Sequence, residues 1–241
     1  MLQVGENAEN IDPKRAFGQR AVSRGFTMTV NAVDFASLLC SRLCHDLLSP
    51  VGAMNNGLEL LADETDPEMR VRCLELLSES ARASANKLKF FRLAFGAAGG
   101  FGDMVDAREA KAAIEGLLGD NARIEIGWLV EEATLSKTAI KVLLNLVLMA
   151  GDTLVRGGRL DVGAEVKDGT TEIVVRAEGQ RLVLDAELRT ALNGEAAEDS
   201  LTPRAAAAWL VHLLAVETGG HSQVLAPDPT VLLFGATIKR A

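Results

Sequence analysis

The chain has 241 residues, 48% of them hydrophobic, so it can bury a real core in one large domain or two modest ones. Its formal net charge of −8 argues against nucleic acid as a partner, because such a surface needs basic side chains to neutralise phosphates. The three cysteines form no CxxC pair, and no apolar stretch reaches the length of a signal or a membrane span. We therefore expect a cytoplasmic protein that does not enter membranes.

The first part of the chain indicates a leader followed by a helical hairpin. Residues 1–30 are polar and lack periodicity, which is typical of a flexible leader. A long helix is predicted over 34–62, because apolar residues recur at alternating spacings of three and four. The predicted apolar seam of this helix consists of Cys40, Leu43, Leu47, Val51, Met54, Leu58 and Leu61.

A second helix is predicted to run from Pro67 to about Phe95. Asp66 suits its N-cap, and Pro67 suits its first turn. The glycines from Gly96 onward end it, so residues 31–96 should form an αα-hairpin and 97–104 a linker. Such a hairpin has apolar surface on more than one side, and no third element directly follows to cover it. The pattern therefore predicts a homodimer in which two hairpins make a four-helix bundle.

Residues 105–241 mix strands with helices, which indicates an α+β domain with helices layered on a sheet. Helices are predicted over 105–118, 135–155, 185–193 and 203–218. Strands are predicted over 122–130, 221–226 and 230–238, together with a β-hairpin over 159–178 that turns at Asp168-Gly169.

His45 is the candidate for chemistry. Helical geometry places it about 160° from the centre of the seam, so it should point away from the hairpin core. Asp46 can orient its imidazole, which leaves the other ring nitrogen free as a nucleophile. The residues that share this sector with His45 are Leu38, Ser41, Arg42, Ser49, Gly52 and Asn56, with Asn55 beside them. An ordinary exposed histidine is the competing interpretation.

Pro50 lies inside this helix and removes the backbone donor for the carbonyl of Asp46, so the helix should bend just after His45. A bend that only fits the curvature of a bundle is equally compatible. His212 and His221 are expected to have structural roles. Cys40, Cys44 and His45 lie on one helix without a fourth ligand elsewhere, so we expect no metal site.

Residues 45–51 (HDLLSPV) resemble the H-box of sensor histidine kinases, in which a histidine, an acid and a proline lie on the first helix of a dimeric hairpin. The second half of the chain resembles their ATPase domain, but the residues that contact nucleotide in that domain are replaced here. Met149 stands where the magnesium-binding asparagine belongs, and a thioether is a poor ligand for that hard cation. Ala177 and Arg181 replace residues of the DxGxG loop, and 203–209 reads as a helix where a phosphate-binding loop is expected.

An H-box on such a degenerate ATPase-like α/β sandwich resembles the ChpT-type histidine phosphotransferases of alphaproteobacteria. The resemblance implies that His45 takes a phosphoryl group from the receiver domain of a hybrid histidine kinase and gives it to a response regulator. It also implies that the chain binds no ATP and no metal of its own, the Mg²⁺ belonging to the receiver. Asp46 would orient the histidine, and Arg42 and Ser49 would support it.

The resemblance further implies that Leu38, Ser41, Gly52, Asn55 and Asn56 form a docking surface for receivers. Two alternatives stay open at this point. One is a non-catalytic dimeric adaptor that binds receivers, and the other is an atypical histidine kinase that uses ATP through a different loop.

Overall fold

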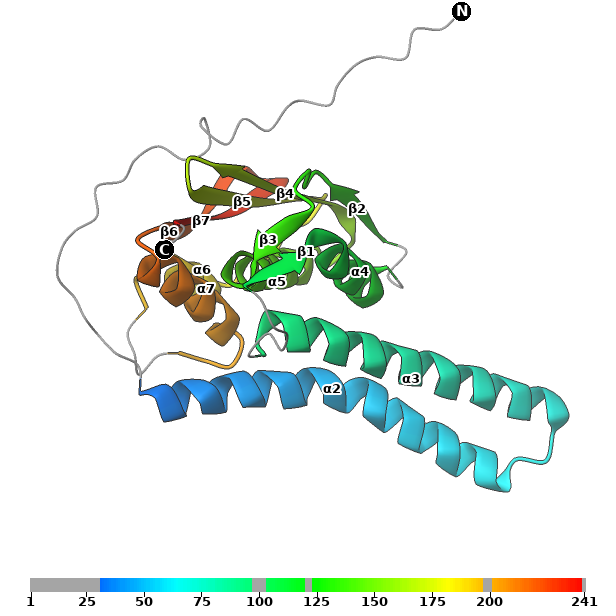
Figure 1. The fold of residues 1–241 in the computed structure, drawn as a ribbon. Helices are drawn as coiled ribbons and strands as arrows, with labels where there is room; N and C mark the ends of the chain where they lie inside the picture. Colours follow the sequence, from blue (N-terminus) through cyan, green and yellow to red (C-terminus); the bar gives the residue numbers. More distant parts are fainter. Residues whose placement is uncertain (1–30, 97–102, 120–122, 197–200, 240–241) are drawn as a thin grey trace, which may run out of the picture.

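The computed structural model describes residues 31–96, 103–119, 123–196 and 201–239 (Figure 1). The predicted leader and most of the predicted linker lie outside this part of the chain. The hairpin consists of α2 (Ala32–Asp63) and α3 (Pro67–Ala94). Both helices begin where a side chain satisfies a free backbone donor: Asn31 accepts from the amide of Val33, and Asp66 accepts from the amide of Glu68.

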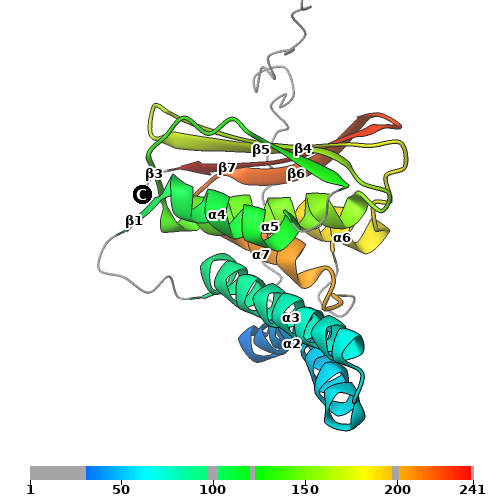
Figure 2. The ribbon, with the colours of Figure 1, turned by 90° about the vertical axis from the view of Figure 1, so that its right-hand side faces the viewer.

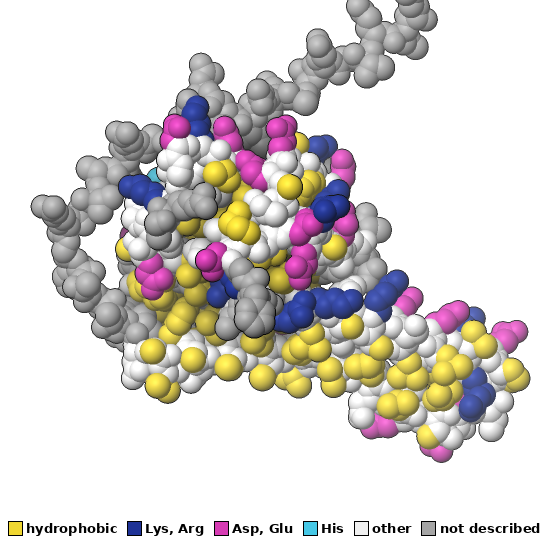
Figure 3. Space-filling model, in the orientation of Figure 1, with side chains coloured by type: hydrophobic (Ala, Val, Ile, Leu, Met, Phe, Trp, Pro, Cys, Tyr) yellow, Lys and Arg dark blue, Asp and Glu magenta, His cyan; other side chains and the backbone are white. Residues whose placement is uncertain are grey.

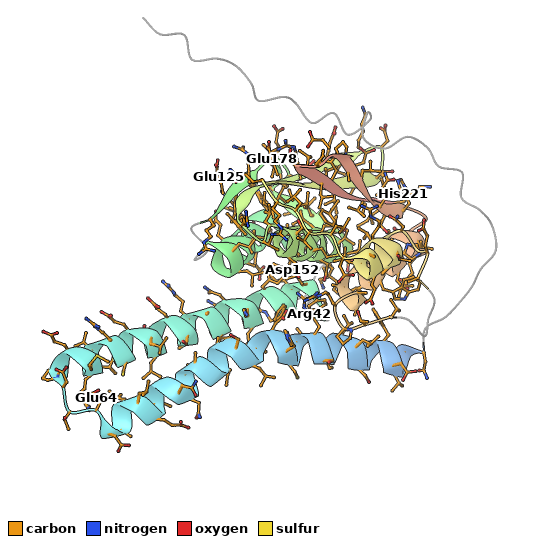
Figure 4. The ribbon with its side chains drawn as sticks, turned by 180° about the vertical axis from the view of Figure 1, so that it is seen from behind. Arg42, Glu64, Glu125, Asp152, Glu178 and His221 are labelled. Atoms are coloured by element: carbon orange, nitrogen blue, oxygen red, sulfur yellow. The ribbon has the colours of Figure 1, made fainter. Side chains whose placement is uncertain are left out.

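The helices of the hairpin approach closely near their connecting turn. A Cβ atom at Gly57 would lie 3.1 Å from Cδ2 of Leu77, so only glycine lets the two backbones come this close without displacing that side chain. The turn end extends beyond the rest of the molecule, and Glu64 marks it in Figure 4.

A five-stranded sheet dominates the remainder, in the order β2-β4-β5-β7-β6, with β2 parallel to β4 and the other pairs antiparallel. Its strands are β2 (Ile124–Trp128), β4 (Gly158–Lys167), β5 (Thr170–Glu178), β6 (His221–Asp228) and β7 (Val231–Lys239). The predicted turn between β4 and β5 is confirmed, because Asp168 and Gly169 both have positive φ, as a tight hairpin of this kind requires. A separate pair, β1 (Met104–Asp106) and β3 (Thr134–Ser136), runs antiparallel.

Helices cover one face of the sheet, and the hairpin lies beneath those helices (Figures 1 and 2). They are α4 (Ala107–Leu118), α5 (Lys137–Thr153), α6 (Ala186–Leu192) and α7 (Ala206–Glu217). Because α5 lies between the sheet and the hairpin, it is buried on nearly every side, and residues 142–150 are all buried. This position explains why its sequence is apolar without a polar face. The predicted α+β class, a helical hairpin followed by an α/β layer, is confirmed.

The end of α3 belongs to the core of the α/β domain. Phe90, Phe91 and Leu93 are buried in one hydrophobic cluster with residues of α4, α5 and the sheet. The side-chain amide of Asn145 donates to the carbonyl oxygen of Ala94 at 3.0 Å and to that of Lys141 at 2.8 Å. The hairpin and the α/β domain are therefore joined by a shared core, and the premise that no third element covers the hairpin is wrong.

The predicted seam is only partly buried. Leu43 and Leu47 are half-buried and pack against the shared core, whereas Cys40, Val51 and Leu58 are exposed. The sequence pattern identifies apolar positions but not the neighbour that each one faces. Here α2 contacts α7 in addition to α3. Figure 3 shows hydrophobic side chains along the length of the hairpin on the face turned to the viewer. The large exposed ones on α2 and α3 are Val33, Leu48, Val51, Leu58, Leu60, Met69, Val71, Leu74, Leu76 and Leu88.

Candidate functional site: an exposed histidine on α2

His45 lies in the first half of α2, with 84% of its side chain exposed. Its Nδ1 lies 3.1 Å from Oδ1 of Asp46. The predicted orientation away from the hairpin core is confirmed. A proton on Nδ1 that donates to this carboxylate leaves the lone pair of Nε2 available to a reacting group in solvent.

The carboxylate of Asp46 is held from its other side by Arg42. Nε of Arg42 donates to Oδ2 of Asp46 at 2.7 Å, and Nη2 of the same guanidinium donates to Oδ2 of Asp152 on α5 at 2.8 Å. Figure 4 shows Arg42 pointing from α2 toward Asp152. One arginine thus ties the acid beside His45 to the α/β domain.

Arg42 corrects the sequence-based expectation for its position. It was expected on the exposed face with His45, but only 9% of it is exposed. Burial works against its charged form, yet the carboxylates of Asp152 and Asp46 outweigh that effect and raise the pKa of the guanidinium. The helical period predicts only which residues of α2 face its partner helix α3. It could not predict that Asp152 on α5 pairs with Arg42.

Pro50 lies inside α2, where it has no N–H to donate to the carbonyl oxygen of Asp46. Nζ of Lys87, on α3, donates to that oxygen at 2.7 Å. Sequence reasoning identified the carbonyl that Pro50 leaves without its helical donor, but it missed Lys87. Pro50 indicates from the sequence that this carbonyl needs another donor. The sequence does not give the register of α3 against α2, which decides that Lys87 is that donor.

Of the predicted docking residues on α2, Ser41, Asn55 and Asn56 are exposed, and Leu38 and Gly52 are half-buried. Ser49, predicted to support His45, is also exposed. A Cβ atom at Gly52 would meet nothing within 4 Å, so the surface there is open. This surface can admit another protein close to the imidazole.

A cavity of about 620 Å³ separates the His45 segment from the α/β domain. Ser41, Arg42, His45 and Asp46 line it from α2, and Met149, Asp152 and Thr153 line it from α5. Its third side comes from the segment between β5 and α6, from α6 and from the residues that precede α7, through Val183, Asp185, Leu188, Thr202, Pro203 and Arg204.

Two of the positions where a kinase would contact nucleotide are apolar here. Met149 is buried, and Ala177 is fully buried in β5 between Leu160 and Leu232. The predicted helix over 203–218 begins at Ala206, and its first residues pack into the core.

The other histidines lie apart from the site. His212 packs against Trp209 with ring centroids 5.2 Å apart, and burial lowers its pKa. His221 has Nδ1 2.9 Å from Oγ1 of Thr237 in the neighbouring strand. In the described part of the chain, no three His, Cys, Asp or Glu side chains are grouped to hold a metal ion. No described helix is both long and apolar enough to cross a membrane.

Comparisons with known proteins agree with this fold. Residues 107–230 match the family model of the histidine phosphotransferase C-terminal domain. The chain is 35% identical over 192 residues to the protein phosphotransferase ChpT of Brucella abortus (strain 2308), covering 80% of this chain and 90% of that protein. It also superposes on the solved structure of a bacterial phosphotransferase with a TM-score of 0.76 and 32% identity, covering 88% of this chain and all of that one.

An α+β protein in which a helical hairpin joins a sheet domain that matches this family model is a histidine phosphotransferase. The chain belongs to the histidine phosphotransferase family, and within it to the ChpT type. The predicted function, phosphoryl transfer in a two-component phosphorelay, is confirmed at this level.

Proposed function

We propose that His45 carries the phosphoryl group, taking it from an aspartyl phosphate on the receiver domain of a hybrid histidine kinase and giving it to the aspartate of a response regulator. The observation that supports this is the exposed imidazole whose Nδ1 contacts Asp46. Nε2 attacks phosphorus, the N–P bond forms as the O–P bond to the donor breaks, and the donor leaves as a carboxylate. The second transfer reverses these steps with the acceptor aspartate.

Asp46 keeps the imidazole oriented and offsets the charge that develops on it during attack. Arg42 acts through Asp46 and not on the phosphoryl group, because its guanidinium already engages two carboxylates. Ser49 is exposed one turn after His45, where its hydroxyl can reach a docked partner. Such transfer depends mostly on positioning and charge neutralisation, so these residues set geometry and do not perform separate covalent chemistry.

The receivers dock on the surface formed by Leu38, Ser41, Gly52, Asn55 and Asn56, and bring their own Mg²⁺ in an acidic pocket. The exposed hydrophobic residues of the hairpin support a homodimer built as a four-helix bundle. The location that fits these partners is the cytoplasm.

The chain works without ATP. Buried Met149 offers no oxygen ligand for Mg²⁺, and buried Ala177 offers no carboxylate for adenine. The alanines from Ala205 to Ala208 are packed in the core, which removes the mobile backbone that phosphates would need.

The proposal is tested by incubating the full chain with labelled ATP and Mg²⁺ alone, and separately with a labelled phosphorylated receiver domain. We expect label on the chain only from the receiver, and none on His45→Ala. His221→Ala is the matched control, because His221 is also exposed but lies on β6, and it should be labelled like the unmodified chain.

Two outcomes would contradict the proposal. Label on His45 from ATP alone would identify an atypical histidine kinase. Receiver binding that is unchanged in His45→Ala, with no label on either protein, would identify an adaptor.

A further inference from the structure

Pro50 leaves the backbone carbonyl of Asp46, directly beside His45, without its helical hydrogen-bond donor. In an α-helix the carbonyl of residue i accepts from the amide of residue i+4, and proline at that position has no amide hydrogen. The carbonyl of Asp46 therefore needs a donor from outside α2, since a backbone acceptor without a partner costs free energy where water is restricted.

Lys87 supplies that donor from the other helix of the hairpin. Its Nζ lies 2.7 Å from the carbonyl oxygen of Asp46, a short distance typical of a hydrogen bond from a charged group. Lys87 is half-buried, so its ammonium group reaches the carbonyl from within the space between the helices. The contact joins α2 and α3 at the level of the phosphorylation site.

Asp46 is thereby fixed at both of its polar ends. Lys87 holds its main chain, and Arg42 holds its carboxylate, whose remaining oxygen lies 3.1 Å from Nδ1 of His45. A shift of the Asp46 backbone would move the carboxylate that orients the imidazole, and such transfer is sensitive to displacements of this kind.

We propose that Lys87 is a positioning residue that replaces the helical donor removed by Pro50 and so sets the orientation of His45 through Asp46. Its effect on phosphoryl transfer rests on the proposed function, but its effect on the imidazole does not. The proposal makes the roles of Lys87 and Pro50 interdependent, because Pro50→Ala restores an amide that can satisfy the same carbonyl.

The test is a double-mutant cycle with Lys87→Met and Pro50→Ala in the full chain. Lys87→Met alone should slow the maximal rate of transfer between His45 and a receiver roughly tenfold, with the half-saturating receiver concentration unchanged. In the Pro50→Ala background, Lys87→Met should change that rate less than about twofold. Lys89→Met, an exposed lysine of the same helix, is the matched control and should behave like the unmodified chain.

The nitrogen NMR shifts of the His45 ring provide a readout that needs no phosphoryl transfer. They should move in Lys87→Met, but not when Pro50→Ala is already present. An equal effect of Lys87→Met in both backgrounds, or no effect in either, would overturn the proposal. If the unmodified chain accepts no phosphoryl group while the ring shifts follow the predicted cycle, the proposed function fails and the role of Lys87 stands.

Discussion

Asp46 is the residue on which the contacts of the site converge. Its carboxylate lies between the imidazole of His45 and the guanidinium of Arg42, and its carbonyl accepts from Lys87. Arg42 extends this arrangement to Asp152, so the acid that serves the histidine is braced by the α/β domain as well as by the hairpin. A buried cation between two carboxylates is costly to remove, because its partners keep their charges.

Arg42→Met keeps the aliphatic stem but leaves Asp46 and Asp152 without their shared cation. We expect a loss of about 1 to 2 kcal/mol in the free energy of unfolding, a reduced figure because Asp152 is half exposed and screened by water. Transfer through His45 should also slow, since Asp46 is free to rotate. Urea denaturation and single-turnover transfer measure the two effects.

Asp152→Asn distinguishes the ion pair of Arg42 with Asp152 from the ion pair of Arg42 with Asp46. It weakens the contact with α5 but leaves Arg42 paired with Asp46, so it should reduce stability and retain most of the transfer rate. An Arg42→Met variant with unchanged stability and unchanged rate would contradict the bracing role.

At the level of single residues, the sequence predicts those features of the site that the geometry of α2 alone determines. The orientation of His45 and the carbonyl left without a donor by Pro50 follow from helical geometry alone. The partners Asp152 and Lys87 come from other elements, 110 and 41 positions away from the residues they contact, so no local pattern contains them.

The element that joins the two parts of the molecule is α3. It pairs with α2, and its end lies in the core with α4 and α5. Asn145 fastens that end through a fully buried amide, which donates to the last carbonyl of α3 and to its own helix. A buried amide with two such bonds is a strong constraint on how α3 meets α5.

Asn145→Asp has nearly the same shape, but it removes both donors and places an acid against two carbonyl oxygens. We expect it to lower the free energy of unfolding by about 2 to 4 kcal/mol, measured by chemical denaturation. Asn56→Asp, the same change at an exposed position on α2, should cost less than about 0.5 kcal/mol. Equal stability of the two variants would show that the amide does not secure α3.

The elements themselves were largely predictable, because their caps, turns and periods are local. Asp66 capping α3 and the Asp168-Gly169 turn are two cases in which a side chain or a backbone preference fixes a boundary. The strands β1 and β3 were missed, since each has three residues and forms by pairing with the other, although α4 and β2 lie between them in the chain. The apolar run over 135–155 was predicted as a helix and forms α5. Its burial on both sides explains the lack of a polar face, and periodicity alone could not show that this helix lies between two layers.

The whole molecule has a layered order of sheet, helices and hairpin, and the hairpin is covered on one side only (Figure 2). The α/β domain takes the apolar residues near His45, whereas those facing away from it are exposed along α2 and α3. A second copy of the hairpin would cover them and leave His45 accessible. The proposed homodimer therefore fits the fold, although the premise that no third element covers the hairpin is wrong.

Leu58→Glu tests this assembly, because Leu58 is 57% exposed on α2 and a carboxylate cannot be buried there unpaired. We expect the unmodified chain to sediment as a dimer at micromolar concentration and the variant to shift toward monomer. Leu129→Glu, at a comparably exposed position after β2, should remain dimeric. A monomeric unmodified chain would refute the dimer.

The central claim is that the phosphoryl group resides on His45 between two receivers. The most direct measurement is a rapid-quench chase in which a labelled phosphorylated receiver, the full chain and an unlabelled second receiver are mixed without ATP. Label should rise first on the chain and then fall as it accumulates on the second receiver, and His45→Gln should abolish both signals. Label that reaches the second receiver without passing through the chain, or that persists in His45→Gln, would contradict the account.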